Sequence, residues 1–123
     1  MTSRIATIVL DAVDPDRIAA FWSAVLGWVE TERDEEVITL SPPGGGGPSM
    51  DVVAVPVGRA VENRLHLDLR ADGSTTAAEL ERLLGLGARH ADVGQGPDVS
   101  WTVLADPEGN EFCLLAQTVQ DLA

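Results

Sequence analysis

Two patterns of apolar residues, one with strand period and one with helical period, follow each other in the first half of the chain. Asp14 and Pro15 predict the cap and first turn of a helix. The Asp side chain accepts hydrogen bonds from the free amides of the first turn, and Pro lacks the N–H group that would have no partner at the first helical position. One buried helical stripe is expected, made of Ile18, Phe21, Trp22, Val25 and Leu26. Gly27 predicts the helix end. Strands are expected at residues 4–11, 28–32, 36–41 and 50–55.

The second half repeats this order. Residues 64–70 alternate strictly, with leucines on one face and His66, Asp68 and Arg70 on the other. Thr76 and Glu79 predict a capping box for a second helix, which ends near Gly85–Gly87. Further strands are expected at residues 88–92, 100–105 and 111–116, with a tight turn at residues 106–110. The chain is therefore predicted to be α+β, a single domain over residues 1–123 with tandem βαβββ units at 4–57 and 64–116.

Composition and charge narrow the possible partners. The chain has 123 residues, of which 45% are hydrophobic and 23% charged, as in a folded domain. Its formal net charge is −12, and it has eight arginines and no lysine. Without a basic stripe, neither nucleic acid nor an anionic membrane surface is an expected partner. The single cysteine, Cys113, excludes an internal disulfide, and the N-terminal pattern lacks a signal peptide, so we expect a cytoplasmic protein.

Several motifs in this order resemble a known superfamily. They are Val9–Asp14 with Phe21-Trp22 and Leu26-Gly27, then Leu65–Leu69, and above all Asp106-Pro107-Glu108-Gly109-Asn110 with Glu111–Leu114. The chain resembles the glyoxalase/bleomycin-resistance/extradiol dioxygenase (vicinal oxygen chelate) superfamily, and within it the small glyoxalase-like branch. The resemblance implies mixed sheets that curl around a shared cleft, and a homodimer. It does not imply one chemistry, because this fold serves isomerases, lyases, dioxygenases and binding proteins.

The resemblance also implies metal-ligand positions, one on each of four inward strands. Carried onto this chain, they fall on Thr7, Val53, His66 and Cys113. Threonine is a poor ligand and valine is none, whereas a catalytic zinc normally has three protein ligands. We therefore expect no bound metal or other cofactor. The alternative is a divalent metal held by His66 and Cys113 with Asp51, which shares the strand face of Val53, as third donor.

Two functions remain open on sequence grounds. Six side chains are expected to line the cleft and contact a ligand: Thr7, Val53, His66, Asp68, Trp101 and Cys113. The first function is metal-free binding of a small molecule. The alternative is a lyase or isomerase, with or without a metal, in which His66 is the catalytic acid or base. His66 and Asp68 are about 7 Å apart along their strand, too far for a hydrogen bond unless both side chains lean together. Cys113 is expected to be a buried, inert thiol.

Overall fold

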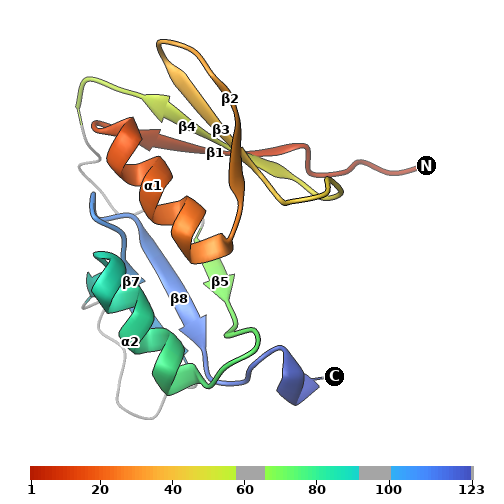
Figure 1. Cartoon of the computed structure of the whole chain (residues 1–123), viewed down its shortest axis with the longest axis vertical. Coiled ribbons are helices and arrows are strands. Elements are labelled where there is room, and N and C mark those ends of the chain that lie inside the picture. Colours follow the sequence, from red (N-terminus) through yellow and green to blue (C-terminus); the bar gives the residue numbers. More distant parts are fainter. Residues whose placement is uncertain (58–65, 92–100, 123) are drawn as a thin grey trace. The chain divides into compact units, whose positions relative to one another are not determined.

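The chain forms two compact units, Met1–Gly58 and Arg59–Ala123. The computed structural model describes residues 1–57, 66–91 and 101–122. Each unit has the order βαβββ, and one four-stranded mixed sheet accompanies one α-helix (Figure 1). The predicted α+β class with a duplicated βαβββ plan is therefore confirmed. Among the described residues, no helix combines the length and apolar character needed to cross a membrane.

The first unit builds its sheet in the order β1-β4-β3-β2, with β1 and β4 parallel and the other pairs antiparallel. Its elements are β1 (Thr7–Ala12), α1 (Pro15–Leu26), β2 (Val29–Arg33), β3 (Val37–Ser41) and β4 (Ser49–Ala54). The parallel pairing of β1 and β4 is possible because α1 and two strands separate them along the chain.

Helix α1 begins and ends as its sequence predicts. The Asp14 carboxylate accepts a hydrogen bond from the Arg17 amide at 3.3 Å, and Gly27 ends the helix at φ 70°. Phe21 and Trp22 pack edge to face, with ring centroids 5.2 Å apart. The helix packs against β3 and β4, whose alternate residues are buried. The buried side chains of this core include Ile18, Phe21, Trp22, Ile38, Leu40, Met50 and Val52.

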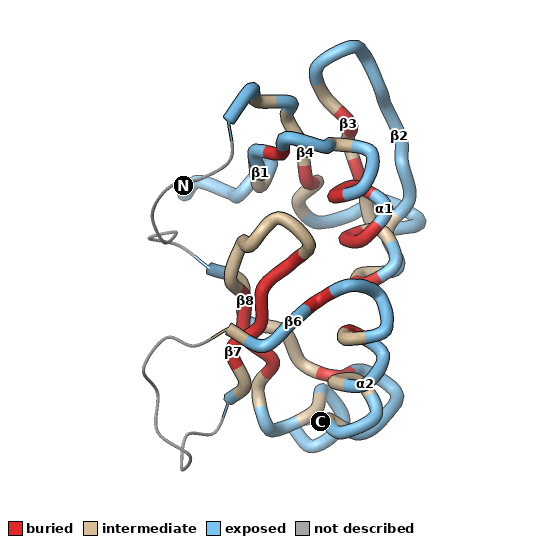
Figure 2. The backbone as a smooth tube through the Cα atoms, turned by 90° about the vertical axis from the view of Figure 1, so that its left-hand side faces the viewer, coloured by how far each residue is buried: buried red, intermediate tan, exposed pale blue. Residues whose placement is uncertain are grey.

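The second unit repeats the plan in the order β5-β8-β7-β6, with β5 and β8 parallel. Its elements are β5 (Leu67–Leu69), α2 (Thr76–Leu86), β6 (Arg89–His90), β7 (Trp101–Ala105) and β8 (Glu111–Leu115), followed by a 3-10 turn at Gln120–Leu122. The strand expected at residues 64–70 is thus shorter, and residues 64 and 65 lie outside the described residues. Figure 2 shows that buried positions of this unit concentrate in β7 and β8.

The predicted capping box of the second helix is wrong by one residue. Thr75, not Thr76, caps α2, and its hydroxyl accepts a hydrogen bond from the Ala78 amide at 3.1 Å. The Thr76 hydroxyl instead donates to the Ala116 carbonyl at 2.7 Å. The residue three positions after the cap is therefore Ala78, so the reciprocal glutamate of a capping box is missing. The predicted end of the helix is confirmed, because Gly87 lies just past it at φ 119°.

The turn between β7 and β8 is organised by one buried carboxylate. Asp106 accepts hydrogen bonds from the Glu108 amide at 2.9 Å, the Asn110 amide at 3.0 Å and the Asn110 side chain at 2.9 Å. Gly109 has φ 89°, a conformation that favours glycine. The turn thereby fixes where β8 begins, and with it the position of Cys113.

Candidate polar site on the second sheet

The central strand β8 presents its residues alternately to two faces of the second sheet. Phe112 and Leu114 are buried on the face that α2 covers. Cys113 points to the opposite face, here called the distal face. Register places Asp68 of β5 beside Cys113 on one side and Val103 of β7 on the other. These three residues therefore form one row across the distal face.

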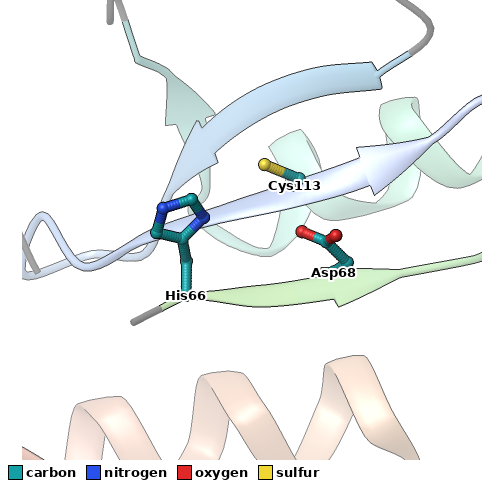
Figure 3. A group of neighbouring side chains, drawn as sticks. All are labelled: His66, Asp68 and Cys113. Carbon is teal, nitrogen blue, oxygen red and sulfur yellow. The ribbon is translucent and has the colours of Figure 1, made fainter. Parts of the chain in front are cut away.

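Three polar side chains converge on this face (Figure 3). His66 comes just before β5, Asp68 lies within β5 and Cys113 within β8. The imidazole nitrogen, carboxylate oxygen and sulfur that could bind a metal all lie within 4.8 Å of one another. His66 and Asp68 therefore lean toward each other, which resolves the separation expected from their spacing along the strand. Both are exposed, whereas Cys113 is only 5% exposed.

The environment of Cys113 keeps its thiol protonated. Burial raises the pKa of the thiol above its usual value, and the negative charge of Asp68 and a hydrogen bond with that carboxylate raise it further. A protonated thiol is a weak nucleophile. The expectation of an inert cysteine thus agrees with the direction of this pKa shift, and Asp68 contributes to it.

Trp101 adds an aromatic surface to the same face. Because Val103 pairs with Cys113 and Trp101 pairs with Leu115, strand alternation places Trp101 on the distal face, diagonal to Cys113. Its side chain is 41% exposed at the start of β7. Diagonal neighbours at this spacing are within reach of a large aromatic side chain. The second unit thus presents four of the six predicted contact residues on one sheet face.

The other two predicted contact residues lie in the first unit, on the face of its sheet turned away from α1. The Thr7 hydroxyl is hydrogen bonded to the Ser49 hydroxyl at 3.2 Å, and Val53 is half-buried on β4. Asp51, the third metal donor expected on sequence grounds, accepts a hydrogen bond from the Thr39 hydroxyl at 2.7 Å. Their roles toward a ligand stay predictions.

The register of the two units shows which residues are equivalent. Each unit has a buried alanine, Ala12 in the first and Ala71 in the second. Its carbonyl accepts a hydrogen bond from an amide that follows the parallel partner strand, Val55 after β4 and Val119 after β8. Matching these alanines aligns Thr7 with His66, five residues earlier in each unit. Val9 and Asp68 then correspond, and their register partners are Asp51 and Cys113. Asp51, and not Val53, is therefore the equivalent of Cys113.

Asp68 is the donor that sequence reasoning did not count as a metal ligand. The signal was present in the pattern His66-Leu67-Asp68, which places both polar side chains on one strand face. Imidazole, carboxylate and thiolate are all ligands that zinc accepts. The cluster can therefore supply three donors to a metal ion, one more than the two good donors found by carrying over the family positions.

The fold is shared with solved structures of low sequence identity. A glyoxalase/bleomycin resistance protein/dioxygenase family enzyme from Burkholderia phytofirmans PsJN is 20% identical, covers 91% of this chain and 97% of its own, and gives a TM-score of 0.68. The fosfomycin resistance protein FosX from Listeria monocytogenes, an E126Q mutant complexed with Mn(II) and 1S,2S-dihydroxypropylphosphonic acid, is 16% identical, covers 98% and 95%, and gives 0.72. A bleomycin resistance determinant encoded on the transposon Tn5 is 21% identical, covers 95% and 99%, and gives 0.58.

These similarities confirm the glyoxalase/bleomycin-resistance fold that the motifs predicted. No curated protein matches the chain. The model of the glyoxalase-like domain family matches residues 7–115, almost the whole sequence. The chain therefore belongs to the glyoxalase-like domain family.

Proposed function

We propose that this protein binds a small molecule on the distal face of the second sheet, and that binding rather than catalysis is its function. The observation that carries the proposal is the convergence of His66, Asp68 and Cys113 on a face that also bears the exposed ring of Trp101. A small-molecule site needs an apolar surface with a few fixed polar groups, and this face supplies both. Val103 provides an apolar floor beside Cys113.

The chemistry of the face favours a flat ligand that is neutral or cationic. The Asp68 carboxylate accepts hydrogen bonds, and Trp101 offers a surface for stacking and for cation–π contact. The formal net charge of −12 attracts cations at long range. Glu111 shares the parity of Cys113 on β8, and Arg70, one residue past the end of β5, continues the alternation of Asp68, so the charge on the face itself is mixed.

Binding is preferred to catalysis because the candidate nucleophile, the Cys113 thiol, is not activated. The pKa of the Cys113 thiol is raised by burial and by Asp68, which disfavours a nucleophilic role. In addition, Thr7 occupies the position where the resemblance implies a metal-binding His or Gln, and Cys113 occupies the position where it implies a metal-binding Glu. The family's metal-dependent chemistry is therefore not transferred to this chain.

Proton transfer by His66 is the second candidate function. It is favoured by the exposed imidazole and by the nearby Asp68 carboxylate, which could orient the ring. A ligand that purifies with the protein separates the two functions. Recovery of that molecule unchanged after long incubation supports binding, whereas its conversion by the wild type but not by His66→Gln supports catalysis.

Dye binding tests the proposed face directly. Proflavine is a planar cation, and fluorescein is a planar anion of comparable size. We expect proflavine, but not fluorescein, to quench the tryptophan emission, and Trp101→Phe to remove most of the quenching. Trp28→Phe is the matched control and should retain it. Equal quenching in wild type and Trp101→Phe would contradict the proposal.

The homodimer expected from the resemblance stays a prediction. Sedimentation velocity distinguishes a 13.0 kDa chain from a particle of twice that mass. A concentration-independent monomer would contradict the expected dimer without bearing on the dye experiment.

A further inference from the structure

We propose that His66, Asp68 and Cys113 form a binding site for a zinc-class divalent cation, with all three ligands supplied by the second unit. This site goes beyond the proposed function and does not depend on it, because a cation can bind with or without an organic ligand. It rests on the mutual distances of three donor atoms and on the chemistry of those atoms.

The donor set differs from the one that the family resemblance implies. The family's set takes one ligand from each of four strands. This chain has Thr7 at the first of these positions, and the Thr7 hydroxyl is hydrogen bonded to the Ser49 hydroxyl. Here the third donor is Asp68 of β5, two residues after His66, which comes just before that strand. Three protein ligands with one open coordination position are the usual composition of a zinc site that accepts a further molecule.

The spacing of the donors suits a zinc ion after small side-chain rotations. Tetrahedral zinc with N, O and S ligands separates its donor atoms by about 3.4–3.6 Å. The three donors here lie within 4.8 Å of one another, so no pair must approach by more than about 1.4 Å. His66 and Asp68 are exposed and can rotate toward Cys113. Cys113 is fixed in the interior strand β8, and register fixes Asp68 beside it.

The sulfur determines which cations the site prefers. Thiolate and imidazole ligands favour zinc and similar transition metals, whereas manganese and magnesium prefer oxygen ligands. When zinc binds, the thiol loses its proton to solvent and a zinc–sulfur bond replaces the S–H bond. The Asp68 oxygen that faces the thiol then faces the cation instead. The two negative charges of thiolate and carboxylate balance the charge of the ion, and no group is oxidised or reduced.

A cobalt and zinc titration tests the assignment. Protein freed of metal with EDTA is titrated with Co²⁺, whose bond to a thiolate gives a near-ultraviolet charge-transfer band. Zinc affinity is measured by competition with a chromophoric chelator. We expect one ion per chain, the band in wild type and its loss in Cys113→Ala. His66→Ala and Asp68→Asn should each weaken zinc binding at least about tenfold, since even outer ligand partners commonly contribute that much.

Matched variants make the result specific. His90→Ala changes the other histidine, which is exposed on β6, and should leave zinc affinity unchanged. Asp51→Asn should also leave it unchanged. An effect of Asp51→Asn equal to that of Asp68→Asn would overturn the assignment of the third ligand. Absence of the charge-transfer band in wild type with an unaltered circular dichroism spectrum would overturn the site itself.

The same samples separate the cation site from the proposed function. Proflavine quenching measured in EDTA reports organic binding without metal. Quenching that persists while zinc fails to bind would overturn only the cation site. Zinc binding without any proflavine quenching would support the cation site and contradict the proposed binding face.

Discussion

Asp68 and Cys113 are direct register partners in the parallel ladder of β5 and β8, with His66 close to both. Burial raises the pKa of the Cys113 thiol, and the charge of Asp68 and its hydrogen bond with the thiol raise it further. The carboxylate that adds to the effect of burial on the thiol is therefore also placed to share a cation with it. This relationship makes the row across the distal face a candidate site rather than a set of separate polar residues.

Asp68→Asn should lower the pKa of the Cys113 thiol. The substitution removes the negative charge that opposes thiolate formation, so more thiolate exists at a given pH. We expect iodoacetamide to react with the metal-free variant faster than with wild type at neutral pH, with the midpoint of the pH–rate curve shifted to lower pH. Asp72→Asn, in the exposed loop before α2, is the control. Identical pH–rate curves for Asp68→Asn and wild type would show that Asp68 does not act on the thiol.

His66→Ala should leave the free energy of unfolding within about 0.5 kcal/mol of wild type, because the side chain is exposed. Urea denaturation measures this directly. A loss above about 2 kcal/mol would indicate that His66 is a structural residue. Leu83→Ala is a positive control on the same unit, since Leu83 is fully buried and its truncation should cost about 2–5 kcal/mol.

Asp106→Ala should destabilise the second unit by about 2–4 kcal/mol, because two amides and one side-chain amide lose a buried acceptor. Asp106→Asn retains one carbonyl oxygen and should lose less. Urea denaturation orders the three proteins. Equal stability of Asp106→Ala and wild type would mean that the turn does not depend on this carboxylate.

Substitution by alanine should have opposite effects on stability at two glycines, Gly27 and Gly85. Gly27 has φ 70° and open space where an alanine methyl group would lie, so Gly27→Ala should cost about 1 kcal/mol from backbone strain alone. Gly85 lies inside α2 and also has open space, so Gly85→Ala should stabilise the protein by about 0.5 kcal/mol. Thermal unfolding should shift in opposite directions for the two variants. A shift in the same direction would contradict the role given to Gly27 as a left-handed cap.

Local signals in the sequence predicted most of the fold. Asp14, Pro15 and Gly27 marked the first helix correctly because caps act within a few residues. The sequence did not identify Thr75 as the cap of the second helix, because either of two adjacent threonines can cap a helix. In the structure the Thr76 hydroxyl donates a hydrogen bond to the Ala116 carbonyl, just past β8, and Thr75 is left as the cap.

The candidate site was harder to predict because it depends on pairing between distant strands. Carrying over the family's metal positions pointed to Val53 in the first unit, whereas matching the register of the two units makes Asp51 the equivalent of Cys113. Loop lengths differ between the two units, so a position carried over from a sequence pattern can be wrong by two residues. Such an error is not apparent from strand alternation, because residues two apart lie on the same face of the strand. The approach of His66 and Asp68 to Cys113 also depends on side-chain rotamers, which strand alternation leaves open.

Zinc-edge anomalous diffraction from crystals grown with equimolar zinc tests the cluster most directly, because it locates the ion without reference to activity. We predict one strong anomalous peak per chain, within bonding distance of His66, Asp68 and Cys113. The peak should weaken in crystals of Asp68→Asn and keep its height in His90→Ala. A fully ordered cluster without a peak, or a peak on other residues alone, would contradict the claim that these three side chains act as one site.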